Sequence, residues 1–154
     1  MRLSATGWWS TARLMIKLDA GASVKVALGI GCDRGTPAAT IAQAVDAALE
    51  QAGVIASDVG AVASIDLKSD EPGLLDIAAV RGWHKRFYPA AELARVLVPN
   101  PSEVVRKYAG TPSVSEAAAL LAAATDMSQL LVEKYKLRGP DGRNATISIA
   151  RITQ

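Results

Sequence analysis

Hydrophobic and polar residues follow one another along the chain in blocks that predict strands and helices in turn. Residues Val24 to Ile30 form a short run rich in Val, Ile and Leu, which is typical of a buried strand. A helix is expected from Pro37 to Ala52, because its apolar residues recur on one face and Gly53 follows it. The same order of strand, polar loop and helix recurs at Val59 to Ile65 and Glu71 to Val80.

The second half of the chain predicts a terminal β-hairpin. From Leu130 to Leu137 and from Ala145 to Ile152 the apolar pattern changes to a period of two, and a Gly-Pro-Asp-Gly turn lies between them. Early strand-helix alternation followed by an antiparallel pair predicts an α/β fold, a single three-layer domain whose mixed central sheet has helices on both faces. The remaining elements expected here are a strand at Lys85–Tyr88 and helices at Ala90–Val96, Pro101–Tyr108 and Ser113–Ala124. Thr36 is the expected N-cap of the first helix, and Ser113 and Glu116 have the spacing of a capping box at the start of the last one.

Length, charge and cysteine content narrow the class of protein. The chain has 154 residues, half of them hydrophobic, which suits one domain; residues 1–22 show no clean period and are interpreted as an N-terminal extension of a domain at 23–154. A formal charge of +2 disfavours a broad basic face for nucleic acid. No stretch approaches the ~20 apolar residues that cross a bilayer, and no signal peptide is recognised. With one cysteine and no internal disulfide, we expect a cytoplasmic protein that binds neither nucleic acid nor membrane.

Four polar blocks stand where the chain is expected to turn into helices. Each combines capping side chains with a proline or glycine, and each leaves backbone N–H groups at a helix N-terminus, where anions bind. If these helix ends converge, they form one anion-binding rim. The blocks are Gly31–Pro37, Ser64–Gly73, Val98–Glu103 and Gly110–Glu116.

The first two blocks contain candidate cations and a candidate acid. Arg34 and Lys68 are placed to hold anionic groups, and Asp66 is placed to act as a general acid or base. Asp70 and Glu71 are interpreted as complements to a helix dipole. A tight turn with a buried thiol and a solvated Arg34 is an equal alternative for the first block. The predicted ligand-binding residues are Cys32, Arg34, Gly35, Thr36, Ser64, Lys68, Asn100, Ser102, Thr111 and Ser113.

Metal and triad chemistry find little support in the composition. His84 is the only histidine, and Cys32 has no second cysteine with which to complete a zinc site. A Ser-His-Asp triad would have to use His84, and the nucleophile-elbow sequence is missing. The segment Trp83–Tyr88 mixes cations with aromatics and is interpreted as a solvated turn that leads into an edge strand. We therefore expect no metal and no other cofactor.

The four blocks also match a known family in order and spacing. The matching stretches are Gly29–Cys32 with Arg34–Thr36, Ala63–Lys68 with Asp70–Leu74, Val98–Glu103, and Gly110–Val114 with Glu116–Ala118. Together they resemble the C-terminal domain of the cobalamin-biosynthesis protein CbiG, a domain that also occurs alone as CobE. The resemblance covers roughly Val24 to Arg151.

The resemblance implies a role in building the corrin ring, with a precorrin intermediate as ligand. CbiG is associated with opening a lactone ring and releasing a two-carbon fragment from a cobalt-precorrin, but it has additional N-terminal regions that 22 residues cannot replace. Precorrins carry many acetate and propionate carboxylates, which helix N-termini with Arg34 and Lys68 could hold. The resemblance therefore implies a precorrin carrier, or an accessory to another enzyme of the cobalamin pathway.

Two alternatives stay open at this point. The chain could be a stand-alone hydrolase acting on a precorrin, with Asp66 as general acid or base. It could also be a phosphate- or nucleotide-binding α/β module that uses the same helix ends.

Overall fold

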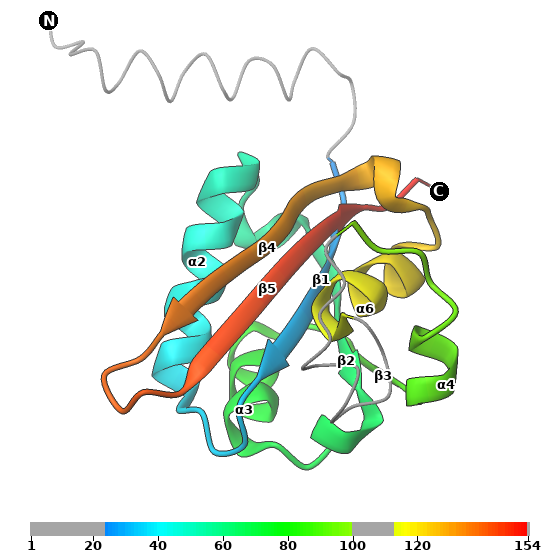
Figure 1. The fold of residues 1–154 in the computed structure, drawn as a ribbon. Helices are drawn as coiled ribbons and strands as arrows, with labels where there is room; N and C mark the ends of the chain where they lie inside the picture. Colours follow the sequence, from blue (N-terminus) through cyan, green and yellow to red (C-terminus); the bar gives the residue numbers. More distant parts are fainter. Residues whose placement is uncertain (1–23, 100–112, 154) are drawn as a thin grey trace, which may run out of the picture.

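A computed structural model of the chain describes residues 24–99 and 113–153, in which helices lie on both sides of a five-stranded sheet (Figure 1). The strands are β1 (Val26–Cys32), β2 (Val59–Ile65), β3 (Lys85–Tyr88), β4 (Leu130–Arg138) and β5 (Asn144–Arg151). The helices are α2 (Ala38–Ala52), α3 (Pro72–Arg81), α4 (Ala90–Leu93) and α6 (Val114–Ala123). Three short 3-10 turns are η1 (Ala56–Asp58), η2 (Asp66–Lys68) and η3 (Met127–Gln129).

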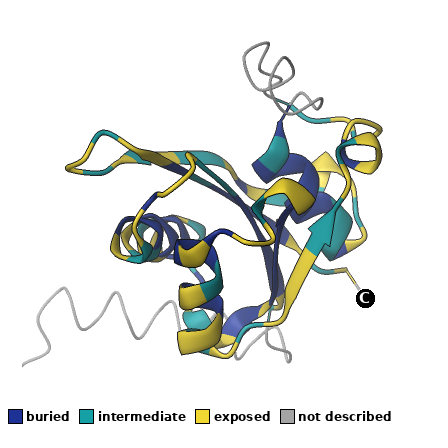
Figure 2. Ribbon diagram, turned by 90° about the horizontal axis from the view of Figure 1, so that it is seen from below, coloured by how far each residue is buried: buried dark blue, intermediate teal, exposed yellow. Residues whose placement is uncertain are grey.

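The sheet is mixed, with strand order β3-β2-β1-β5-β4. Strands β1, β2 and β3 run parallel, whereas β5 is antiparallel to both β1 and β4. Helices α2 and α3 pack on one face, and α6 with α4 packs on the other, so that the buried sheet lies between two helical layers (Figure 2). The predicted three-layer α/β fold with a terminal hairpin is confirmed.

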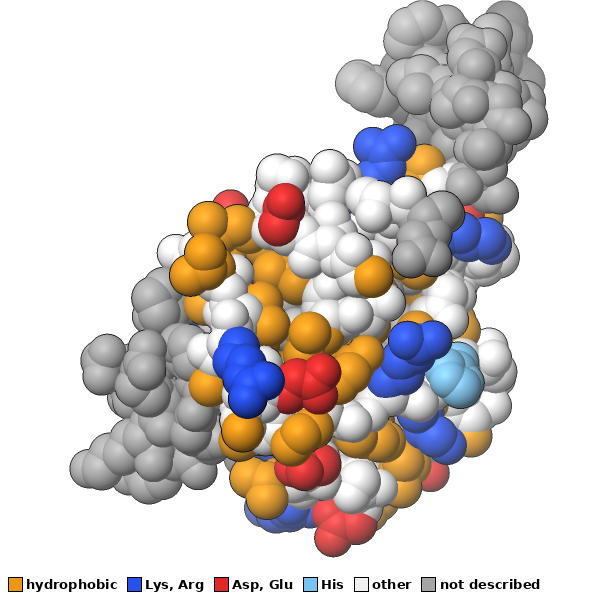
Figure 3. Space-filling view, turned by 90° about the vertical axis from the view of Figure 1, so that its right-hand side faces the viewer, with side chains coloured by type: hydrophobic (Ala, Val, Ile, Leu, Met, Phe, Trp, Pro, Cys, Tyr) orange, Lys and Arg blue, Asp and Glu red, His pale blue; other side chains and the backbone are white. Residues whose placement is uncertain are grey.

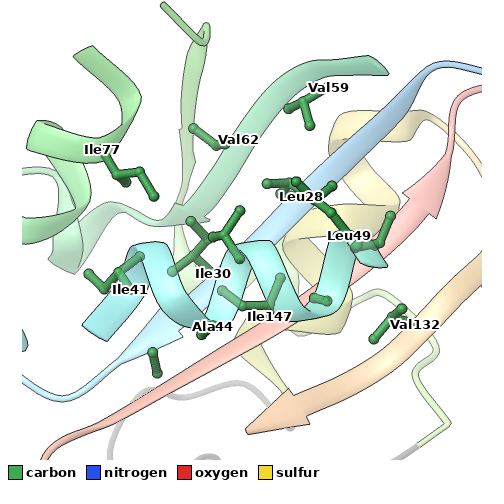
Figure 4. Packing of buried hydrophobic residues seen from close by; sticks show 14 of the residues in the cluster. Leu28, Ile30, Ile41, Ala44, Leu49, Val59, Val62, Ile77, Val132 and Ile147 are labelled. Atoms are coloured by element: carbon green, nitrogen blue, oxygen red, sulfur yellow. The ribbon is translucent and has the colours of Figure 1, made fainter. Parts of the chain in front are cut away.

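The main hydrophobic cluster lies between the sheet and the helices α2 and α3. Leu28 and Ile30 of β1 and Ile147 of β5 pack toward Ile41 and Ala44 of α2, and all five are fully buried (Figure 4). Burying one large aliphatic side chain contributes roughly 1.5–3 kcal/mol, so this cluster holds α2 against the sheet. The apolar stripe predicted for α2 is therefore the buried face of that helix.

Two predicted helix caps differ from the structure. Thr36 was expected to cap α2, but Pro37 occupies the N-cap and the Thr36 hydroxyl donates to the Asp33 carbonyl oxygen at 2.6 Å. Ser113 is the N-cap of α6, yet its side chain makes none of the capping hydrogen bonds expected from its spacing to Glu116. The first turns of both helices therefore lack a side-chain cap.

Strand β1 ends later than predicted because β5 pairs with it up to Cys32, opposite Ala145. Cys32 therefore belongs to a strand and not to a loop. The helix predicted at Pro101–Tyr108 lies outside the described residues. So does the extension predicted at 1–22, and the division of the chain into 1–22 and 23–154 stays a prediction.

Helix α6 lies close to β1 because Gly29 has no side chain. A Cβ atom on Gly29 would collide with the Ser115 carbonyl oxygen and lie 2.7 Å from the Ala119 amide nitrogen. Farther along the helix, Ala123 packs with Ala27, so α6 runs antiparallel to β1. The N-terminus of α6 is thereby brought to the carboxyl end of β1.

We predict that Gly29→Ala destabilises the fold by about 3 kcal/mol or more, because the added methyl meets helix backbone that cannot rotate away. Gly31→Ala, on the same strand, is the matched control, since its Cβ would meet only the Thr146 Cβ at 4.0 Å. Urea unfolding followed by circular dichroism measures both variants. Equal unfolding free energies for the two would contradict the close packing of α6 on β1.

Candidate functional site

The candidate site lies at the edge of the sheet where β1, β2 and β3 end. Open α/β sheets bind ligands outside the carboxyl ends of their parallel strands. Residues 33–37 leave β1 there and lead into α2, and residues 66–71 leave β2 and lead into α3. The turn of the β4–β5 hairpin reaches the same edge, because β5 starts opposite the end of β1.

Arg34 joins the loop after β1 to the loop after β2. Its Nη2 donates to the Leu67 carbonyl oxygen at 2.7 Å, and its Nη1 donates to Asp70 Oδ1 at 2.9 Å. The hydrogen bond from Arg34 lowers the pKa of the Asp70 carboxyl and raises the pKa of the guanidinium. Both side chains are exposed, at 58% for Arg34 and 80% for Asp70.

Glu71 makes a buried contact between the same two loops. Its side chain is fully buried; Oε2 accepts a hydrogen bond from the Gly35 amide at 2.9 Å, and Oε1 lies 3.0 Å from Arg34 Nη1. Oε1 makes an ion pair there without the angle of a hydrogen bond. The interpretation of Glu71 as a dipole complement was incomplete, because this carboxylate also fixes the loop after β1.

The hairpin turn adds contacts that were not predicted from the sequence. Arg143 Nε donates to the Arg34 carbonyl oxygen at 3.0 Å, and the Asn144 amide donates to Asp33 Oδ2 at 2.8 Å. Arg143 is also paired with Asp141 at 3.0 Å. No local pattern marks the contacts with Arg34 and Asp33, since those two partners lie more than a hundred positions earlier in the chain.

Three predicted ligand-binding side chains are used inside the fold. The Thr36 hydroxyl donates to the Asp33 carbonyl oxygen and, at 3.4 Å, to the Asn144 carbonyl oxygen. The buried Ser64 hydroxyl donates to the Ile30 carbonyl oxygen at 2.6 Å. Cys32 packs against the cluster below α2, and burial raises the pKa of its thiol to about 11 although Lys68 opposes the shift. These side chains therefore hold the edge of the sheet together.

The backbone amides of the first loop are also engaged. The Gly35 amide donates to Glu71, and the Thr36 amide donates to the Asp33 carbonyl oxygen at 3.1 Å. The first turns of α2 and α3, by contrast, have no side-chain cap. A shallow cavity of about 250 Å³ lies between these two helix ends, lined by Gly35, Thr36, Pro37, Ala38, Glu71, Pro72, Gly73 and Asp76.

Asp66 and Lys68 bracket the exposed η2 turn. Asp66 is exposed and Lys68 is half-buried, and within the described ranges the Lys68 ammonium makes no hydrogen bond or ion pair. The sequence predicted two cations for a ligand, but Arg34 is already bound to two carboxylates. Lys68 is therefore the predicted cation that remains available.

The last two polar blocks are only partly described. Asn100, Ser102 and Thr111 lie outside the described residues, and their ligand contacts stay predictions. Ser113 is buried at the N-cap of α6, with a hydroxyl that has no hydrogen-bond partner. Because α6 starts at the carboxyl end of β1, the structure brings Ser113 to the same edge as Lys68.

Residues 24–99 and 113–153 give no support for a metal site or a membrane-spanning helix. No three His, Cys, Asp or Glu side chains there are grouped to hold a metal ion. No helix in those ranges has the length and apolar character needed to cross a membrane. On the face that Figure 3 shows, Lys and Arg side chains are scattered among hydrophobic and acidic ones instead of gathering into a basic patch.

Comparison with known proteins connects the chain to one family. The model of the family described as "Cobalamin synthesis G C-terminus" matches residues 26–150. The chain is 38% identical over 127 residues to a cobalt-precorrin-5A hydrolase of Priestia megaterium, covering 82% of this chain and 32% of the relative. It is 38% identical over 115 residues to protein CobE of a Sinorhizobium species, covering 73% of this chain and 74% of the relative.

A crystal structure supports the same relationship. The structure of CobE, a protein from the cobalamin (vitamin B12) biosynthetic pathway, superimposes with a TM-score of 0.66 at 32% identity. The match covers 86% of this chain and 93% of CobE. The chain belongs to the cobalamin synthesis G C-terminal family, and it is a cobalamin biosynthesis protein similar to CobE. It spans about a third of the length of the hydrolase relative.

We predict that Cys32 reacts slowly with iodoacetamide in the folded protein. A pKa of about 11 in place of 9.0 lowers the thiolate fraction at pH 8 about 100-fold, and the thiolate is the reacting form. The alkylation rate should keep rising between pH 9 and pH 11 when followed by mass spectrometry. The urea-unfolded chain is the control; a folded-state rate that levels off near pH 9 would contradict the buried thiol.

Proposed function

We propose that this protein binds a precorrin intermediate during corrin-ring synthesis and serves as its carrier or as an accessory to another enzyme of the pathway. The proposal is supported by membership of the family and by the similarity to CobE. The observation that carries it is the cavity between the N-termini of α2 and α3, which have no side-chain cap, at the edge that holds Lys68. The N-terminus of α6, also without a side-chain cap, reaches the same edge on the other face of the sheet.

Such an edge suits a ring with peripheral carboxylates. Helix N-termini attract anions through their free amides and the helix dipole, and a lysine adds a formal positive charge. Lys68 and Ser113 are the described side chains that we assign to ligand contact. Arg34, Cys32, Ser64 and Thr36 are assigned to supporting roles, because each is engaged within the fold.

Absorbance titration tests the binding, because corrinoids are coloured. With cobyrinic acid, a corrin with free acetate and propionate side chains, we expect saturable binding at low salt that weakens as salt is added. Lys68→Gln should bind several-fold more weakly and with a smaller salt dependence. Lys85→Gln is the matched control, since Lys85 lies on β3 opposite Val62, the middle residue of β2, and not at the edge where the parallel strands end.

Two outcomes of that titration, and one outcome of a thermal unfolding comparison, would count against the proposal. Wild-type protein that shows no affinity for the corrinoid at low salt would contradict it. Equal losses of affinity in the Lys68 and Lys85 variants would show that the ligand does not bind at this edge. Stabilisation by a nucleotide but not by the corrinoid would favour the nucleotide-binding alternative.

Hydrolysis of a precorrin is a second candidate, supported by the similarity to cobalt-precorrin-5A hydrolase and by the exposed Asp66 carboxylate at the end of β2. If the chain is an enzyme, Asp66→Asn should abolish turnover and leave corrinoid binding nearly unchanged. Product analysis by mass spectrometry decides this. Turnover that is unchanged in Asp66→Asn would reject the assignment of Asp66.

A further inference from the structure

We propose that the η2 turn is the part of the site that meets the corrin ring, with Leu67 against the ring face and Lys68 against a peripheral carboxylate. We further infer that Arg34 acts as a positioning residue, which holds this turn and does not contact the ligand. The inference rests on the proposed corrinoid binding and deepens it by naming the surface that recognises the ring.

Leu67 has an unusual place among the exposed hydrophobic side chains. Its side chain is 56% exposed, and it lies beside Lys68 at the edge where the parallel strands end. No other large exposed hydrophobic side chain among residues 24–99 and 113–153 lies there. The other large exposed hydrophobic residues lie toward the opposite edge, where the helices end and where β1, β2 and β4 begin: Ile55, Val80, Leu97, Met127 and Leu131. Leu67 is thus the side chain of this kind that is available to a ligand seated at the helix N-termini.

Two hydrogen bonds to backbone carbonyl groups fix the turn that carries Leu67. Arg34 donates to the Leu67 carbonyl oxygen at 2.7 Å, so the backbone of the turn is held at the residue whose side chain is exposed. The Glu71 amide donates to the Lys68 carbonyl oxygen at 3.0 Å. Two successive carbonyl groups are thereby bound, and the side chains of Leu67 and Lys68 are left for solvent or ligand.

Both terminal nitrogens of the Arg34 guanidinium contact partners within the fold. Nη1 contacts the Asp70 and Glu71 carboxylates, and Nη2 contacts the turn carbonyl. Two carboxylates on one cation leave this group of three side chains with a net negative charge. A ligand carboxylate therefore gains little from direct contact with Arg34. Lys68, by contrast, makes no ion pair within the described residues, so its ammonium is available to the ligand.

Leu67 and Lys68 together match the chemistry of a corrinoid. The ring offers an apolar face, and its edge carries acetates and propionates. A leucine packed on the face gains hydrophobic contact, while the adjacent ammonium pairs with a carboxylate at the edge. A nucleotide or inorganic phosphate would use the lysine and the helix ends but would gain little from the leucine.

The test compares variants in titrations with cobyrinic acid at low and high salt. Leu67→Ala should weaken binding about ten-fold and leave the salt dependence unchanged, because only apolar contact is lost. Leu97→Ala is the matched control, since Leu97 is 78% exposed and lies toward the opposite edge. Leu67 is exposed, so its variant should fold, which circular dichroism checks.

Two variants of Arg34 separate positioning from direct contact. Lysine keeps the charge but cannot reproduce the planar fork that reaches Leu67 and Asp70 together. If Arg34 positions the turn, Arg34→Lys and Arg34→Gln should weaken binding by the same factor and alter the absorbance band of the bound ring alike. Near-normal affinity in Arg34→Lys beside a large loss in Arg34→Gln would show direct charge contact and overturn this part.

The outcomes also separate this inference from the function on which it rests. Wild-type protein that fails to bind cobyrinic acid removes the proposed function, and the inference falls with it. Wild-type protein that binds, while Leu67→Ala binds equally well, overturns the inference alone. Equal losses in Leu67→Ala and Leu97→Ala would also overturn it.

Discussion

The edge of the sheet that we assign to ligand binding depends on one buried carboxylate, that of Glu71. The carboxylate accepts a hydrogen bond from the Gly35 amide, in the loop after β1, and makes an ion pair with the Arg34 guanidinium. Glu71 itself is the N-cap residue of α3. A buried charge is tolerated only where partners compensate it, so the two loops are held at a defined separation. The N-termini of α2 and α3 and the η2 turn take their places from this contact.

Much of the fold could be predicted from the sequence, because local patterns carry that information. The apolar run that forms β2, the stripe on α2 and the period of two in the hairpin each depend on neighbours within one element. The true end of β1 could not be predicted, since pairing with the distant β5 decides it. The predicted cap of α2 was wrong for a related reason. The Thr36 hydroxyl donates to the Asp33 carbonyl oxygen, in the loop before the helix, and the pattern of the helix does not determine the shape of that loop.

The positions of Arg34 and Lys68 in the fold could be predicted from the sequence, but the contacts of their side chains could not. Strand-loop-helix repeats locate Arg34 and Lys68 at the same edge, because parallel strands end there. Which cation stays available depends on side chains brought together by the tertiary fold: Asp70 and Glu71 engage Arg34 and leave Lys68. Arg143 was missed because its role comes from the packing of the hairpin turn on the loop after β1.

The most direct measurement of the central claim is the unfolding free energy of Glu71→Gln beside that of Asp70→Asn. Both variants remove one negative charge near Arg34, but only Glu71 is buried and bonded to both loops. We predict a loss of about 2 kcal/mol in Glu71→Gln and little change in Asp70→Asn, where the exposed pair is screened by solvent. Equal stabilities for the two variants would contradict the account that the buried carboxylate organises this edge.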